Sequence, residues 1–369
     1  MAQRDFYIDR LRVVLTALVL LHHTAITYGA IGGWFWHELQ PSRTPSSILL
    51  ILFCTTNQAW FMGCFFLFAG YYTPVSLVRK GYWRFILDRL IRLGIPILAF
   101  GLLLGPFTAA LVTYAQGDGF WPTFVALWHR KEFIIGPLWF AEALLIFSVV
   151  YVLRIRIAGP QPGNDGAAKP TPSLVPGWRA WLLCALLVGA GALALRQPFP
   201  IGTSLFGYWA IYVVLFVVGI RAKPRNWFAQ LTWKQARPWI ITASVVWPTL
   251  PLAWMLAKGN RQLQYRILLG RLPLCLLGAV HRLGNHRRVA PLVPGSLQPA
   301  FSNLGVARAT RLRGLHPSSA GAGRNFSSAP WVSCACPGVK FAVVGALTCI
   351  ATWLLADPLV RLPGVRRVV

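Results

Sequence analysis

His23 and Arg12 are the first residues whose types and spacing point to chemistry. They are eleven positions apart, about three helical turns, so both side chains share a face and lie roughly 16 Å apart along the axis. An imidazole with a pKa of about 6.5 suits a general base, and a guanidinium suits an anionic ligand. A structural histidine bonded to a neighbouring helix is an equal alternative.

Arg89 and Arg92 form a second candidate pair, in the segment RFILDRLIRLGIP at residues 84–96. At i and i+3 spacing, two guanidinium groups share a helix face and can form forked hydrogen bonds to phosphates. The alternative is ordinary anchoring, in which basic residues hold a helix end at the cytoplasmic side of a membrane.

Glu142 is the third candidate, because it is the acidic residue in the interior of a predicted membrane span. A buried carboxylate needs a partner, and His23 is the natural one. A Glu–His pair would orient the imidazole and stabilise its charged form, as the third group of a catalytic triad does. The alternative is a structural pairing with an arginine.

The elements that position these residues must be membrane helices. Of the 369 residues, 56% are hydrophobic and only 12% are charged, against about 25% charged in soluble domains. The formal net charge is +27, but the basic residues lie between apolar segments rather than on one soluble face. We therefore expect a protein of the lipid bilayer with no nucleic-acid partner. The seven cysteines contain no C-x-x-C pair, so neither a metal site nor a disulfide framework is predicted.

The apolar segments predict an all-α, polytopic transmembrane helix bundle with about eight spans. The spans are residues 11–30, 48–77, 93–115, 137–153, 178–195, 205–220, 239–256 and 339–356. Residues 116–133 are expected to form an external loop. Basic residues recur in alternate connections, which predicts cytoplasmic N- and C-termini, and a bacterial inner membrane is the expected location.

The chain divides into three parts by composition. Residues 1–256 form the N-terminal transmembrane region, residues 257–337 an aberrant segment, and residues 338–369 the last helix with a cytoplasmic tail. The aberrant segment is rich in Arg, Pro, Ser and Gly, and no Asp or Glu occurs between Asp165 and Asp357. It is either a large basic loop or a segment translated out of frame, because apolar codons of a GC-rich gene give such residues when shifted by one base.

Together these residues resemble the acyltransferase-3 family of membrane acyltransferases, including its glucan-modifying branch. The resemblance rests on YIDRLR at 7–12 followed by His23, on residues 65–72, on Arg89-Leu-Ile-Arg92 with Pro96, and on PLWF at 137–140. It covers roughly residues 5–256 and 339–367.

The resemblance implies about ten spans and transfer of an acyl group from acyl-CoA to a hydroxyl of a sugar or glucan. It makes His23 the catalytic base, places Arg12, Arg89 and Arg92 near the acyl-CoA donor, and assigns Glu142 to an acidic site position. It implies no metal. Two late helices of the family would occupy residues 257–337, so the chain as written could be an inactive remnant.

A transporter is the alternative from another functional class, since intramembrane His and Glu residues can relay protons. No inverted repeat is evident in the sequence, which counts against this alternative. Binding of coenzyme A would separate the two functions.

Overall fold

The computed structural model describes residues 6–159, 176–196, 209–230, 232–246 and 336–361. Within these ranges the chain is helical, with one isolated bridge between Tyr28 and Leu39. Five helical stretches are long and apolar enough to cross a membrane: Tyr7–Thr27, Pro45–Lys80, Tyr82–Ala115, Gly136–Ala158 and Pro337–Ala356. Two shorter apolar helices, Trp178–Ala192 and Trp209–Ala222, accompany them. The predicted all-α, multi-pass membrane fold is confirmed.

The predicted spans and the helices agree in place but differ in extent. The expected span at 48–77 consists of two helices, α2 (Pro45–Gln58) and α3 (Phe61–Lys80). The connection at 116–133 contains helix α7 (Phe120–His129), so the prediction of a loop without regular structure was wrong, and its external position stays a prediction. The two ends of segment 116–133 are polar, but between them lies a short run whose aromatic and aliphatic residues recur at helical spacing. The aberrant segment 257–337 lies outside the described residues except for its last two positions.

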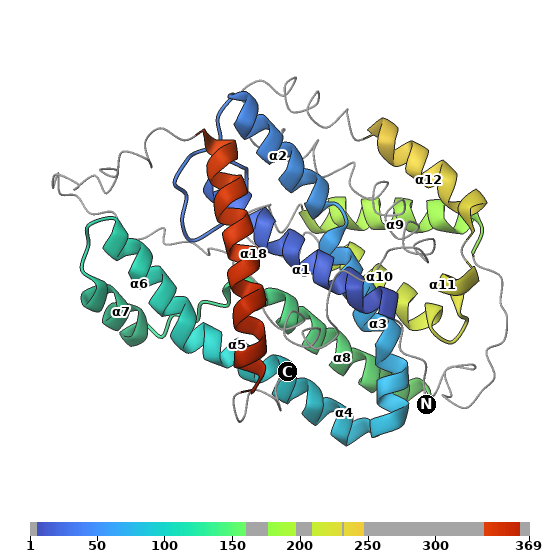
Figure 1. Ribbon diagram of the computed structural model, residues 1–369. Helices are drawn as coiled ribbons and strands as arrows, with labels where there is room; N and C mark the ends of the chain where they lie inside the picture. The colour runs from blue at the N-terminus through green and yellow to red at the C-terminus, as the bar shows by residue number, and fades with distance from the viewer. Residues whose placement is uncertain (1–5, 160–175, 197–208, 231, 247–335, 362–369) are drawn as a thin grey trace. The chain divides into compact units, whose positions relative to one another are not determined.

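The described residues fall into two compact units. The first contains residues 1–15, 55–87 and 146–295, as far as they are described, and its centre is the pair α3 and α10 (Trp209–Ala222) (Figure 1). A Cβ atom on Gly70 would collide with the carbonyl oxygen of Phe216, and one on Gly219 with that of Leu67. Glycine at these two crossing points therefore allows the backbones to touch, as in other membrane helix pairs.

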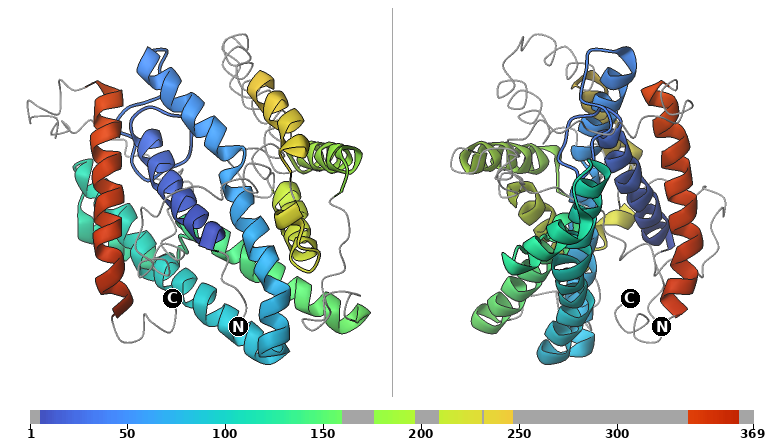
Figure 2. Two further views of the ribbon diagram at one scale, coloured as in Figure 1. Left: turned by 45° about the vertical axis from the view of Figure 1, so that its right-hand side comes forward. Right: turned by 90° about the vertical axis from the view of Figure 1, so that its left-hand side faces the viewer.

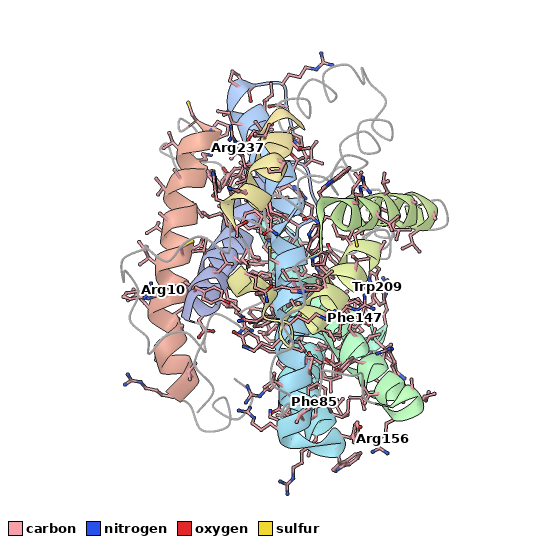
Figure 3. The ribbon with its side chains drawn as sticks, turned by 90° about the vertical axis from the view of Figure 1, so that its right-hand side faces the viewer. Arg10, Phe85, Phe147, Arg156, Trp209 and Arg237 are labelled. Atoms are coloured by element: carbon pink, nitrogen blue, oxygen red, sulfur yellow. The ribbon has the colours of Figure 1, made fainter. Side chains whose placement is uncertain are left out.

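An aromatic cluster fills the space beside this crossing. Phe66 stacks on Tyr212 with ring centroids 4.5 Å apart, and Phe147 of α8 (Trp139–Ala158) lies 5.3 Å from Phe66. Phe147 also meets Trp209 edge to face at 5.5 Å, and Figure 3 shows these two side chains next to each other. Such aromatic pairs contribute roughly 0.5–1.5 kcal/mol each beyond their buried area. The first unit is therefore held by close backbone packing and interlocked rings.

The second unit contains residues 16–54, 88–145 and 296–369, as far as they are described. Its longest element, Tyr82–Ala115, begins in the first unit and runs as an almost continuous helix (Figure 2). The run consists of α4 (Tyr82–Arg89), the π-helix η1 (Leu90–Gly94), α5 (Ile95–Ala99), the π-helix η2 (Phe100–Leu104) and α6 (Gly105–Ala115). The predicted span 93–115 is only its second part.

The π-helix η2 is held from outside by the segment before α8. The carbonyl oxygen of Gly101 accepts a hydrogen bond from the backbone N–H of Ile134 at 3.2 Å. A Cβ atom on Gly101 would collide with the ring of Phe133. Since no water is present in the hydrocarbon core, a widened turn needs such protein partners. Downstream, α6 and α7 form a helical hairpin (Figure 1).

The last helix, α18 (Pro337–Arg361), also belongs to the second unit. The ring of Phe341 lies 5.7 Å from that of Phe53 on α2. Gly345 faces Leu21 of helix α1 (Phe6–Thr27), where a Cβ atom would come within 2.7 Å of a leucine methyl group. Helix α18 is therefore packed on the part of α1 that carries His23.

Candidate active site

Helix α1 carries both Arg12 and His23 without interruption. Its Leu, Val and Ala residues provide a continuous apolar run, which favours a membrane helix. His23 lies only four residues before the end of α1 at Thr27, roughly 6 Å along the axis, and roughly 16 Å from Arg12. The imidazole is thus close to the end of the span that lies away from the N-terminus.

The orientation of the His23 ring fixes which nitrogen is basic. Its Nδ1 lies 2.8 Å from the carbonyl oxygen of Val19, one turn earlier. A carbonyl oxygen can only accept a hydrogen bond, so Nδ1 carries the proton and donates it. In the neutral ring, Nε2 is then the basic nitrogen that carries the lone pair. The helix therefore presents Nε2 as a proton acceptor.

Two aromatic rings lie against the His23 imidazole. The indole of Trp34 is 4.2 Å from it between ring centroids, at an interplanar angle of 48°. The ring of His22 lies 5.3 Å away in an edge-on arrangement and is buried. Trp34 comes from the connection between α1 and α2, residues 28–44, which we call the α1–α2 loop. Nothing in the spacing of the sequence singled out Trp34.

The α1–α2 loop is fastened at its base by hydrogen bonds. The backbone N–H groups of Glu38 and Leu39 both donate to the carbonyl oxygen of Thr27, at 3.0 and 3.2 Å. The Ser47 hydroxyl donates to the carbonyl oxygen of Gly29 at 2.7 Å. The loop therefore folds back on the end of α1, which brings its middle residues over His23.

Side-chain contacts hold the α1–α2 loop at two further points. Phe35 packs against a cluster formed by Ala109 of α6, Leu127 of α7 and Ile134. Lys340 of α18 forms an ion pair with Glu38, with Nζ 2.5 Å from Oε1 and both side chains mostly buried. The loop is thus anchored to the helical hairpin and to the last helix, and Trp34 is positioned by both.

The same loop changes the chemistry of Tyr28. Burial of the phenol, and secondly the negative charge of Glu38, raise the pKa of Tyr28 above its usual value. Both causes disfavour the phenolate, since a buried charge loses its hydration and a neighbouring carboxylate repels it. Tyr28 is therefore a neutral hydroxyl at the start of the α1–α2 loop.

The two arginines expected near an acyl donor differ in their surroundings. Arg89 ends α4 and its Nε atom is buried, whereas the side chain of Arg92 is 45% exposed. Arg92 lies in the π-helix η1, and its Nε donates to Asp88 Oδ1 at 3.0 Å. Asp88 was not singled out from the sequence, although an acidic residue four positions before an arginine is a recognisable pair.

Glu142 lies in the first turn of α8, where the helix dipole favours a carboxylate. Its side chain is exposed and forms no ion pair or hydrogen bond with the part of the chain that the structure describes. The expected pair with His23 is therefore not formed among these residues. The buried face of α8 includes Ala141, Leu144 and Phe147, and Glu142 lies to the side of it.

Among the described residues, no group of three or more His, Cys, Asp or Glu side chains is placed to hold a metal ion. The described surroundings of His23 therefore consist of one imidazole with a defined basic nitrogen and an indole beside it. Arg12, Arg89 and Arg92 are carried by α1, α4 and η1. The imidazole can remove a proton from a hydroxyl, and each guanidinium group can bind an anion.

Comparison with known proteins relates this site to a family. The model of a family described as an acyltransferase domain matches residues 5–305. Among curated relatives, the "Glucans biosynthesis protein C" of Salmonella gallinarum (strain 287/91 / NCTC 13346) is 28% identical over 235 residues, which are 60% of this chain and 59% of the relative. The proteins of the same name from Salmonella paratyphi B (strain ATCC BAA-1250 / SPB7) and Salmonella agona (strain SL483) match equally.

The chain spans about three fifths of the length of the curated relatives it matches. No solved structure matches it. The family match covers most of the chain and includes α1, η1 and α8, the elements that carry His23, Arg92 and Glu142. The resemblance inferred from the sequence motifs is thereby confirmed: this multi-pass membrane protein belongs to the acyltransferase-3 family, the acyltransferase domain family of membrane acyltransferases.

Proposed function

We propose that the protein transfers an acyl group from acyl-CoA to a hydroxyl group of a sugar or glucan, in a bacterial cell membrane with both termini in the cytoplasm. The family match supports acyl transfer, and the name of the curated relatives supports a glucan acceptor. The observation that carries the proposal is the 2.8 Å contact between His23 Nδ1 and the Val19 carbonyl oxygen. It makes Nε2 the basic nitrogen of a part-buried imidazole near the end of α1.

In the proposed reaction, Nε2 of His23 takes the proton from the acceptor hydroxyl while the oxygen attacks the carbonyl carbon of the thioester. The carbon–sulfur bond breaks, and the coenzyme A thiolate takes the proton from the imidazolium. The products are an acyl ester and free coenzyme A, and His23 returns to its neutral form. No covalent intermediate on the protein is required.

The donor would be held from the cytoplasmic side. Arg12, Arg89 and Arg92 supply guanidinium groups suited to the phosphates of coenzyme A. Because Arg12 lies about three turns before His23 on α1, a donor bound near it must extend along the helix to reach Nε2. The elongated arm of coenzyme A, which ends in the thioester, has the shape for this path.

Glu142 is proposed as the second catalytic residue, acting through its charge. A carboxylate on the same unit as His23 would stabilise the imidazolium that forms during transfer. Since the described structure contains no contact between the two side chains, the expected effect of Glu142→Gln on the rate is smaller than that of a His23 substitution.

The test uses the full chain in lipid nanodiscs, with acetyl-CoA as donor and a linear glucose oligosaccharide as acceptor. Release of the coenzyme A thiol and formation of the acetyl ester are both measured. We expect His23→Ala to lower the rate by a factor of about 10² to 10⁴, as loss of a general base does. His129→Ala, at the exposed end of α7, serves as the control. A wild-type rate of ester formation in His23→Ala would show that His23 is not the general base.

A further inference from the structure

The α1–α2 loop covers His23 at the end of α1 that lies away from the N-terminus. His23 lies one turn before the end of α1, and Trp34 of the loop lies beside the imidazole at 4.2 Å. The N-terminus of α1 and the loop are at opposite ends of a single span. A donor that enters beside Arg12 and an acceptor that enters beneath the loop would therefore meet at Nε2 from opposite ends.

We propose that Trp34 forms the acceptor site and that the acceptor's sugar ring stacks on its indole. This inference rests on the proposed function and names the residue that selects the acceptor. A pyranose ring has an apolar face of C–H groups. The π-face of an indole is partly negative and attracts the partly positive hydrogen atoms of these groups. A ring stacked on Trp34 would present its hydroxyl groups next to the imidazole. Trp34 itself takes no part in bond making or breaking.

The common role of a membrane-protein tryptophan is different. Tryptophans at the ends of spans usually anchor a helix among lipid headgroups. Trp34 does not have that surrounding: it is half-buried, faces His23, and contacts Phe35 at 6.0 Å between ring centroids. Phe35 in turn is fixed in the apolar cluster of α6 and α7. The indole is therefore directed into the protein by its loop.

The ion pair between Glu38 and Lys340 is the proposed positioning device for this site. Glu38 lies four residues after Trp34 in the same loop, and Lys340 is on α18, 302 positions away in the sequence. The side chains are only 28% and 15% exposed, so their Coulomb attraction is screened less by solvent and salt than that of a surface pair. The ion pair connects the α1–α2 loop to the last helix, α18.

The first experiment compares Trp34→Ala with Trp34→Phe in nanodiscs, with acetyl-CoA as donor. The acceptors are a linear glucose oligosaccharide and glycerol, which has hydroxyl groups but no ring face. We expect Trp34→Ala to raise the KM for the oligosaccharide about tenfold, with a much smaller change in the KM for glycerol and in the KM for acetyl-CoA. Trp34→Phe keeps most of the wild-type KM, and Trp36→Ala in the same loop is the matched control. An unchanged oligosaccharide KM, or a raised acetyl-CoA KM instead, overturns the assignment.

A binding measurement separates this inference from the proposed function. Equilibrium dialysis of the radiolabelled oligosaccharide, without any donor, needs no turnover. Weaker binding to Trp34→Ala than to wild type supports the sugar site even if no acyl transfer is found, in which case the proposed function alone fails. Equal binding to both proteins overturns the inference, whatever the transfer assay gives.

The second experiment tests the ion pair by exchanging its charges. Glu38→Lys and Lys340→Glu should each raise the KM for the oligosaccharide, because like charges then face each other. The double variant restores the attraction and should recover most of the wild-type KM. Thermal stability is measured in parallel, since a merely structural pair would change stability and kcat without a selective effect on the acceptor KM. A double variant as impaired as the single ones contradicts the positioning role.

Discussion

The Nδ1–H group of His23 donates to the carbonyl oxygen of Val19 within a single helix, at 2.8 Å. This bond separates the two roles of the ring, since Nδ1 fixes its orientation and Nε2 is the basic nitrogen. An asparagine at position 23 can replace the Nδ1–H donor but has no basic nitrogen.

We therefore expect His23→Asn to fold like wild type and to lose activity as fully as His23→Ala. The thermal midpoint of unfolding and the ester-forming rate are measured on the same nanodisc preparation. If the histidine were structural, His23→Asn would keep the rate and His23→Ala would lose stability. That pattern would contradict the assignment of a base.

The crossing of α3 and α10 predicts a large effect from two small substitutions. Gly70→Ala and Gly219→Ala each place a methyl group on a backbone carbonyl of the opposite helix. Overpacking of this kind costs about 1–3 kcal/mol, and backbone atoms cannot move aside as a side chain does. Each variant should unfold at a clearly lower temperature in detergent. Gly94→Ala is the control, because a Cβ atom there meets nothing within 4 Å. An equal effect at Gly94 would show that glycine loss in general, rather than the crossing, is responsible.

The ionisation of Tyr28 predicts a dependence on alkaline pH. Its pKa is raised by burial and by Glu38 from the usual 10.0, so the folded protein holds this proton more tightly than the unfolded chain. The resulting stability is fully present below pH 10 and is lost as the pH rises through the folded pKa. Phenolate absorbance of wild type minus Tyr28→Phe should show a midpoint above pH 10. Glu38→Gln should lower that midpoint without returning it to the usual value, because burial remains. A wild-type midpoint at or below 10 would contradict the environment described.

Much of the membrane fold was predictable from the sequence because the thickness of the bilayer sets how long the apolar segment of a spanning helix must be. Helix α7 escaped prediction because its run is too short to span and has polar neighbours. The π-helices escaped for another reason. In η2 the Gly101 carbonyl has a partner from outside the helix, the Ile134 N–H, and no local pattern records such a contact.

The candidate site likewise contains one part that the sequence predicts and one part that only the folded chain determines. The bond from His23 to Val19 is local and follows from the helix once the histidine is identified. Trp34 lies in a loop without periodicity, and its place depends on Phe35 packing and on an ion pair between residues 302 positions apart. Those contacts arise only when the chain is folded. The sequence therefore identified the imidazole and missed the ring beside it.

Asp88 and Arg92 give a prediction for donor binding. The carboxylate neutralises part of the Arg92 charge through its 3.0 Å contact and would repel the phosphates of coenzyme A. Arg89→Ala and Arg92→Ala should raise the KM for acetyl-CoA, whereas Asp88→Asn should leave it unchanged or lower it. The effects should shrink at high salt, since Arg92 and Asp88 are partly exposed. Arg130→Ala, in an exposed pair with Glu132, is the control. A raised KM in Asp88→Asn would mean that the pair, rather than the free cation, binds the donor.

The arginine-rich segment at 257–337 gives the last prediction, which concerns the gene. The family match continues to residue 305 and so includes the first part of this segment. Helix α18, which follows the segment, packs on α1 and α2 through Gly345 and Phe341, as an in-frame last helix would. The packing of α18 agrees with a frame that is restored before this helix, and the change in composition after residue 256 is the reason to propose that the frame is altered. Codons compatible with residues 313–325, read one base later, permit AVYIHPPLVLVGI, an apolar helix start with a His-Pro pair.

We expect the nucleotide sequence around codons 255–340 to contain two compensating shifts. The frame-corrected chain should then form acetyl ester from acetyl-CoA at a rate at least tenfold above the chain as written, because the two late helices of the family would be present. Both chains are expressed side by side, with His23→Ala of the corrected chain as the blank. An uninterrupted frame shared by close homologues at the protein level would end this interpretation. The segment would then be a basic loop of a working enzyme, and the chain as written would itself transfer the acetyl group.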